Sequence, residues 1–273
     1  MKKLRSQNYQ DFEVIVVDSG STDGTLGIVK EYGYKFYCIP SEEFHHSRTR
    51  NLGAEFSRGD YLVYITQDAL PLDNKFLEKL MEWLKDDRVA GVYGRQKAYP
   101  CATPMEKFFY SYFYPNERKV ITYADLENLT EFYVSHVYVS DVCSAIKKDI
   151  WEKINFDKNI IMAEDKKWAI DVLRAGYNLI YEPKATIYHS HNYSITSVFK
   201  RRFYDSIAMK QICNSSVAAS KGFLYLLNEM KYLMKNHKAW IPYALVYNFA
   251  RFTGFGLGLN YKRIPSVIEK RMS

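Results

Sequence analysis

Residues 12–25 of the chain read FEVIVVDSGSTDGT, and this stretch decides the fold class. Its mostly apolar part, residues 13–17, is a short continuous run that ends at Asp18. Such a run predicts a strand buried on both faces, as in a parallel sheet. The polar, glycine-containing residues 19–25 predict a loop, and a helix is predicted for residues 26–32. The stretch therefore has the strand–loop–helix order of an α/β protein.

The same alternation continues along the chain. Further strands are predicted at residues 35–39, 61–66, 89–95, 137–145, 178–181 and 185–188, and further helices at residues 47–56, 75–85 and 164–175. This order predicts a mainly parallel sheet covered by helices. Ligands of such sheets bind at the carboxyl ends of the strands. Two acids, Asp18 and Asp68, stand at predicted strand ends of this kind.

Charge divides the chain into two regions. The formal net charge is +7, yet residues 195–273 hold thirteen Lys and Arg against three Asp and Glu. The rest of the chain is therefore acidic. We predict an α/β domain over residues 1–194 and a basic, aromatic helical region over residues 195–273. Basic surface attracts anionic lipid or nucleic acid, but no recognisable nucleic-acid motif accompanies it, so no nucleic-acid partner is predicted.

The cysteines and the first residues indicate a cytoplasmic protein. None of the four cysteines forms a CxxC pair, which fits a reducing compartment. Basic residues follow Met1 without an apolar stretch behind them, so no signal peptide is predicted.

Short motifs in a fixed order carry a family resemblance. They are FEVIVVDSGSTDGT at 12–25, RNLGA at 50–54, GDYLVYITQDALP at 59–71, GRQ at 94–96, SDVCSA at 140–145, ED at 164–165, AGYNLIYEP at 175–183, YHSH at 188–191 and FKR at 199–201. Together they resemble the family 2 glycosyltransferases, which have the GT-A fold. The forms TQDALP, GRQ and YHSH look most like the rhamnosyltransferase branch, which uses dTDP-L-rhamnose. The resemblance implies a metal-dependent, inverting transfer of a sugar from a nucleotide donor.

The donor nucleotide is expected at the end of the first predicted strand. In the family the acid at Asp18 bonds the nucleobase, and a carboxylate can accept from a pyrimidine N3–H. A turn or capping role is the alternative. The resemblance also implies donor contacts from the predicted helix at 47–56 and from neighbouring motifs, namely Ser21, Arg48, Arg50, Asn51, Gln67 and Arg201. A solvated helix face is the alternative for the arginines of that helix, and lipid contact is the alternative for Arg201.

The resemblance places a divalent metal at Asp68, the single acid of Gln67-Asp68-Ala69. Mg²⁺ or Mn²⁺ there would neutralise charge on the diphosphate leaving group. In some family members a histidine about two dozen residues beyond the base completes the site. His189 has that spacing, with His191 behind it. A purely structural role for this pair is the alternative.

The resemblance makes Asp165 the general base. An inverting transferase needs a carboxylate that takes the proton from the acceptor hydroxyl. Glu164 would orient this base or contact the acceptor. The alternative is that both acids only favour the start of a helix, where acids are common.

The beginning of the chain departs from the family pattern. Members normally have an apolar strand and a helix before the segment that matches residues 3–10. We therefore expect a GT-A sheet without its usual first strand, which would leave an unpaired edge. A second copy of the chain could cover such an edge, so a homodimer is a further prediction.

The C-terminal region carries an apolar and aromatic segment, residues 239–261, with basic residues on both sides. Arg251 and three glycines make it a poor membrane span. We predict an interfacial helix on an anionic leaflet, with packing on the catalytic domain as the alternative. The expected enzyme acts peripherally at the inner face of the cell membrane, on a saccharide or lipid-linked acceptor, with dTDP-rhamnose or a UDP-sugar as donor.

Two other functions stay open. One is a nucleotidyltransferase on a similar sheet, although no Gly-rich phosphate loop with Lys or Arg is visible. The other is a catalytically degenerate relative that binds a membrane or a partner, which the retained acids oppose.

Overall fold

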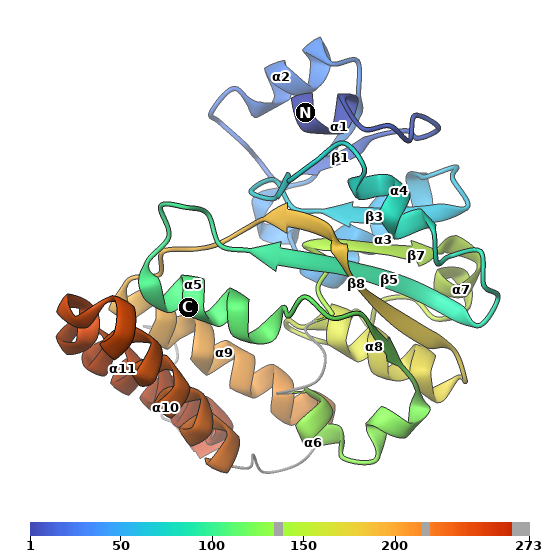
Figure 1. The fold of residues 1–273 in the computed structure, drawn as a ribbon. Helices are drawn as coiled ribbons and strands as arrows, with labels where there is room; N and C mark the ends of the chain where they lie inside the picture. Colours follow the sequence, from blue (N-terminus) through green and yellow to red (C-terminus); the bar gives the residue numbers. More distant parts are fainter. Residues whose placement is uncertain (134–138, 214–218, 264–273) are drawn as a thin grey trace. The chain divides into compact units, whose positions relative to one another are not determined.

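The computed structural model describes residues 1–133, 139–213 and 219–263, drawn as a ribbon in Figure 1. They form two compact units. Unit 1 consists of Met1–Lys97, Tyr114–Glu127 and Val139–His189, and unit 2 of the described parts of Ala98–Phe113, Asn128–Tyr138 and Ser190–Ser273. The last break lies close to the predicted boundary at residue 194, but unit 2 also takes two segments from earlier in the chain. The domains 1–194 and 195–273 stay a prediction.

Unit 1 is an α/β unit, as the sequence predicts. Its strands are β1 Ile15–Asp18, β2 Lys35–Cys38, β3 Tyr61–Ile65, β4 Leu70–Pro71, β5 Val89–Lys97, β6 Lys119–Ile121, β7 Cys143–Lys147 and β8 Asn178–Tyr188. Its α-helices are α1 Lys2–Arg5, α2 Thr25–Glu31, α3 His46–Phe56, α4 Phe76–Met81, α7 Lys148–Lys153 and α8 Glu164–Arg174. The predicted strand at residues 137–145 begins outside the described residues, and β7 itself starts later, at Cys143.

The sheet is mixed, so the expectation of a mainly parallel sheet is wrong. Among the described residues, β1 and β2 form a parallel pair, and a six-stranded sheet has the order β3-β7-β5-β8-β4 with β6 on β8. In this larger sheet β5 and β8 run parallel, and the other pairs are antiparallel. Strand–helix alternation predicts parallel pairing only where one helical crossover joins neighbours in the sheet. The chain reaches β7 from β5 by a much longer path, and β7 runs the opposite way.

A close approach between β5 and β8 accompanies a shift in their pairing register. The two strands predicted at 178–181 and 185–188 are one strand, whose register jumps between the pairs Gly94–Glu182 and Arg95–Thr186. Pro183 lies in this irregular part, and a proline has no backbone N–H for a ladder. A side chain at Gly94 would collide with the Ala185 carbonyl. The register after the jump sets Gln96 beside Ile187.

The core of unit 1 lies between α4 and the larger sheet. It includes Phe76 and Leu80 of α4, Val92 of β5 and Ala145 of β7, all fully or almost fully buried. Cys143 belongs to the same cluster, and burial raises the pKa of its thiol to about 12. A thiol that stays protonated at neutral pH is not a nucleophile, so Cys143 serves packing.

Unit 2 is helical. Its α-helices are α5 Pro104–Phe113, α6 Leu129–Glu131, α9 Ile195–Cys213, α10 Ala219–Asn236 and α11 Ile241–Leu259. Helices α9 and α11 lie side by side in Figure 1, and a Cβ added at Gly258 of α11 would collide with the Phe203 carbonyl of α9. Along the described ranges, no helix has both the length and the apolar character that crossing a bilayer requires.

Candidate functional site

Asp165 lies in the first turn of α8, at a point where the backbone is strained. Helix α8 begins at Glu164, and the residue before it, Ala163, has a φ of 63°. This left-handed conformation costs a residue with a Cβ on the order of 1–2 kcal/mol. Strain of this kind is often stored at functional sites. Glu164 and Asp165 follow directly after this strained residue, in the first turn of α8.

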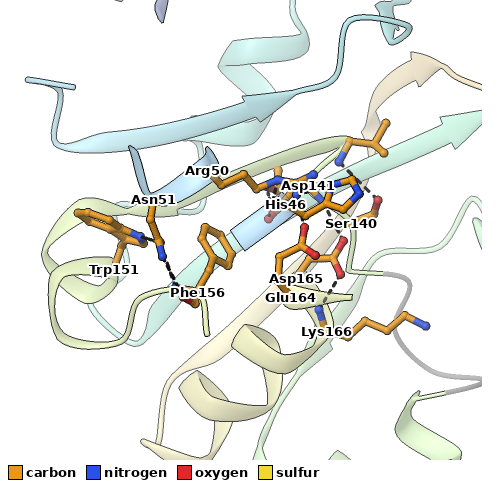
Figure 2. A network of polar contacts seen from close by, with 12 residues as sticks. His46, Arg50, Asn51, Ser140, Asp141, Trp151, Phe156, Glu164, Asp165 and Lys166 are labelled. Atoms are coloured by element: carbon orange, nitrogen blue, oxygen red, sulfur yellow. Dashed lines mark hydrogen bonds and ion pairs between the residues drawn. The ribbon is translucent and has the colours of Figure 1, made fainter. Parts of the chain in front are cut away.

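Backbone groups hold both oxygens of the Asp165 carboxylate. The Lys166 N–H donates to Oδ1 at 2.8 Å, and the Asp141 N–H donates to Oδ2 at 3.3 Å. Asp141 lies just before β7, so a distant segment of the chain contributes to the position of Asp165. Figure 2 shows these residues together. The carboxylate is half-buried and keeps a defined direction.

Arg50 of α3 lies between two further carboxylates (Figure 2). Its guanidinium donates to Glu164, and its Nε lies 3.5 Å from Asp141 Oδ2. The other Asp141 oxygen accepts a 2.6 Å hydrogen bond from the Ser144 hydroxyl. Two carboxylates, those of Glu164 and Asp141, therefore share one guanidinium within unit 1.

Burial, with a smaller contribution from neighbouring acids, raises the pKa of two carboxylates of the site. Burial and the neighbouring Glu164 raise the pKa of Asp165, and Arg50 opposes the rise. Burial raises the pKa of Asp141 to about 7. A carboxylate whose pKa lies above its usual range is a stronger proton acceptor once it is ionised. The position and electrostatics of Asp165 suit a general base.

Asn51 links α3 by hydrogen bonds to Trp151 and Phe156, which come about a hundred residues later in the chain. Its side-chain amide donates to the Phe156 carbonyl at 2.9 Å and accepts from the Trp151 indole at 2.9 Å and the Phe156 N–H at 3.2 Å. The residue is 2% exposed. Its polar atoms are thus engaged inside unit 1, a different placement from the expected donor contact.

Asp68 and His189 meet at the end of the sheet. Strand β4 pairs with the last residues of β8, with Leu70 opposite Tyr188. This pairing brings the turn before β4 beside the residue that follows β8. His189 Nε2 lies 3.5 Å from Asp68 Oδ2. Two residues that are far apart in the sequence thus offer one nitrogen and one oxygen ligand in unit 1.

Gln96 orients the His189 ring. The His189 Nδ1 lies 2.8 Å from Gln96 Oε1, and Gln96 Nε2 donates to the Tyr114 hydroxyl at 2.8 Å. With the Gln96 carbonyl as acceptor, Nδ1 carries the proton, and Nε2 on the Asp68 side keeps its lone pair. This is the arrangement in which histidine binds metals. His191 follows two residues later, in unit 2.

Asp18 ends β1 and closes a tight turn. Its Oδ2 accepts from the N–H groups of Gly20 at 3.0 Å and Ser21 at 2.9 Å. Hydrogen bonds from Ser21 and Gly20 lower the pKa of Asp18, so it stays ionised at neutral pH. Ser21, a predicted donor contact, thus supports Asp18 directly.

The remaining predicted residues lie in different surroundings. Arg48 is exposed on α3, and Gln67 is exposed in the turn before β4. Arg201 lies on α9 in unit 2, where its Nε is 3.1 Å from Asp205. Sequence reasoning assigned no role to Asp141 or Gln96. Both lie in motifs that carried the resemblance, SDVCSA and GRQ. A polar residue within or next to a buried strand was the available signal that each has a specific role.

Comparisons with known proteins agree on one family. The family model described as glycosyl transferase family 2 matches residues 1–154. The O-antigen chain rhamnosyltransferase WbaN of Salmonella anatum is 32% identical over 270 residues, which cover 96% of this chain and 84% of that protein. RfbN of Salmonella typhimurium, also named an O-antigen chain rhamnosyltransferase, is 30% identical over 271 residues, covering 96% of this chain and 85% of that protein.

Solved structures show the same fold at low sequence identity. The mannosyltransferase PcManGT of Pyrobaculum calidifontis, in complex with GDP-Man and Mn²⁺, gives a TM-score of 0.55 at 18% identity, covering 95% of this chain and 69% of its own. TarS of S. aureus in complex with UDP gives a TM-score of 0.53 at 14% identity, covering 96% of this chain and 86% of its own. The predicted GT-A fold and the family resemblance are confirmed, and the chain belongs to glycosyl transferase family 2.

Proposed function

We propose that this glycosyltransferase inverts the anomeric carbon as it moves a sugar, rhamnose from dTDP-L-rhamnose, onto a saccharide or lipid-linked acceptor in cell-surface polysaccharide synthesis. The observation that carries the proposal is the Asp165 carboxylate, which two backbone N–H groups from separate segments hold. The names of the two Salmonella relatives support the sugar and the kind of polymer.

The proposed reaction is a single displacement. Asp165 accepts the proton of the acceptor hydroxyl while that oxygen attacks the anomeric carbon. The bond from this carbon to the diphosphate oxygen breaks, and the nucleoside diphosphate leaves with the electron pair. Attack from the face opposite the leaving group inverts the configuration. Burial and Glu164 raise the pKa of Asp165 and so strengthen it as a base.

The residues at the end of β8 fit a divalent metal. Asp68 offers a carboxylate oxygen and His189 an imidazole nitrogen whose tautomer Gln96 defines. An oxygen and nitrogen set suits Mn²⁺, and Mg²⁺ accepts the carboxylate with water and phosphate oxygens. When bound, the ion would neutralise charge on the departing diphosphate. His191 remains a predicted ligand, and Mn²⁺ in PcManGT supports the metal.

Asp18 is the proposed contact for the nucleobase. The carboxylate stays ionised and closes the turn at the end of β1, so it can accept from the N3–H of thymine or uracil. Cytosine has an acceptor at N3 and should fit poorly.

Thermal unfolding with nucleotides tests the donor site. With Mn²⁺ present, dTDP should stabilise the protein by roughly 2.7 kcal/mol at a hundredfold excess over its Kd, and CDP should not. Replacing Asp18 by Asn removes a charge-assisted hydrogen bond of about 1.5–3 kcal/mol, so affinity should fall at least about tenfold.

Asp23→Asn is the matched control in the same turn, since Asp23 bonds Thr25 and not Asp18. Equal midpoint shifts for wild type and Asp18→Asn would contradict the nucleobase contact. No shift with dTDP, UDP or a nucleotide sugar would favour a degenerate binding protein, and release of pyrophosphate during turnover would favour a nucleotidyltransferase.

Helix α11 supports attachment to an anionic membrane surface. Leu245, Val246, Phe249 and Phe252 lie along one side of this helix, and Phe249 is 73% exposed. Apolar residues exposed in such a stripe are unusual outside interaction sites. Three exposed lysines precede α11 in the chain, on α10 and in the turn after it: Lys231, Lys235 and Lys238. Apolar contact plus positive charge is how interfacial helices bind lipid.

Removing the apolar stripe should weaken membrane binding. The double variant Val246→Ser, Phe249→Ser should reduce affinity for phosphatidylglycerol vesicles at least about tenfold, because burying Phe is worth roughly 1.5–3 kcal/mol. Vesicle sedimentation measures it. Ile28→Ser, at an exposed apolar position on α2, is the control. Unchanged sedimentation would contradict the membrane proposal, and loss of a dimer in the double variant would assign the stripe to the predicted homodimer instead.

A further inference from the structure

Arg50 is buried against acids rather than presented to solvent. Its side chain is 16% exposed, and those of Asp141 and Glu164 are 3% and 4% exposed. Its NH1 also lies 3.4 Å from His46 Nδ1. Taking an ion out of water costs several kcal/mol unless partners compensate. The two carboxylates supply this compensation, so the native partners of Arg50 are in its own chain.

The partners of Arg50 are the two segments that position Asp165. Glu164 precedes Asp165 in the first turn of α8, behind the strained Ala163. The Asp141 backbone N–H bonds Asp165 Oδ2, while the Asp141 side chain faces Arg50 Nε. A change at Arg50 therefore affects Asp165 through both segments, although the hydrogen bonds and ion pairs of Arg50 are made to other residues.

The Asp141 carboxylate gives a second reason why the charges of this network need Arg50. Its Oδ2 is buried and has no hydrogen-bond partner among the described residues, so the guanidinium 3.5 Å away is its main compensation. Without Arg50, this oxygen would face other carboxylates. The segment before β7 would then have to move or take up a proton.

Arg50 also sets the charge of the network. Its positive charge lowers the pKa of both Asp165 and Asp141, against burial and the other carboxylates, which raise it. Loss of this charge would leave acids facing one another. Asp165 would then hold its proton up to a higher pH and could not act as a base there.

We propose that Arg50 is a positioning residue, which holds the general base Asp165 through Glu164 and Asp141 and does not bind the donor diphosphate. This inference rests on the proposed function of Asp165. It replaces the donor contact that the sequence predicted for Arg50.

The test compares Arg50→Gln and Arg50→Lys with wild type. We expect Arg50→Gln to lower kcat by about a hundredfold, the cost of a misplaced catalytic group. The acidic limb of its kcat–pH profile should move to higher pH, and the Kd for dTDP should stay within about threefold of wild type. Arg50→Lys keeps the charge, so its limb should stay in place while kcat falls less.

Arg174→Gln, an exposed change at the other end of α8, is the control for nonspecific effects. An unmoved pH limb with at least tenfold weaker dTDP binding would overturn the proposal. If Arg50→Gln does not fold, Arg50→Lys decides: lower kcat at constant dTDP affinity supports positioning, and weaker dTDP binding overturns it. Full transfer by Asp165→Asn would instead show that the proposed base is wrong, whatever Arg50 does.

Discussion

Replacing Asp165 by Asn should lower kcat for sugar transfer by about 10²–10⁴, the usual contribution of a general base. The amide has nearly the shape of the carboxylate but cannot take the acceptor proton. Its NH₂ group would also face one of the two N–H donors, from Lys166 or Asp141, that now hold the carboxylate. The measurement is release of dTDP from dTDP-rhamnose with an acceptor present, while dTDP binding stays as in wild type.

The pH profile gives this prediction a second readout. Burial and Glu164 raise the pKa of Asp165, so below that pKa the base is protonated and inactive. The acidic limb of kcat should therefore lie above the usual range of an aspartate and disappear in the residual activity of Asp165→Asn. Asp171→Asn is the control. It removes another acid from the same helix, one that pairs with Lys167 at 2.7 Å. An Asp165→Asn enzyme with full activity would rule out this base.

Replacing Asp68 by Asn should remove the metal response and most of the activity. The amide is neutral and a weaker ligand than the carboxylate, so the site would lose the charged oxygen that lies 3.5 Å from His189 Nε2. A catalytic ion supplies several kcal/mol of charge stabilisation, so we expect kcat to fall on the order of a thousandfold. The second readout is the unfolding midpoint, which Mn²⁺ with dTDP should raise in wild type and not in Asp68→Asn.

Asp73→Asn provides the matched control for the metal site. Asp73 lies in the loop after β4 and pairs with Lys79 at 2.7 Å, so its loss should leave the Mn²⁺ response unchanged. A chelator should inactivate wild type and Asp73→Asn alike. An Asp68→Asn enzyme that stays active and ignores the chelator would contradict a metal at this position.

Local residue patterns predicted several elements of unit 1 well. The run before Asp18, the helix over residues 46–56 and the helix over residues 164–174 all appear within a residue or two of their expected bounds. These elements depend on short-range periodicity and on capping and breaking residues, which one segment of sequence contains. The direction of β7 and the joining of residues 178–188 into one strand depend on partners elsewhere in the chain, which local patterns do not reveal.

The ordered motifs of the sequence by themselves determined the family, the α/β class, and the acids at strand ends and at the first turn of α8. What surrounds those acids was decided by the tertiary structure. The sequence contains Arg50, Asp141 and Glu164 as three separate residues, and only the packing of α3, α8 and the segment before β7 makes them one charged network. Likewise, Asp68 and His189 come together because β4 pairs with the end of β8. The residue types determine which chemical groups are present. Burial and distance determine the pKa of a carboxylate and the partners of a guanidinium, and burial and distance are defined only when distant segments pack.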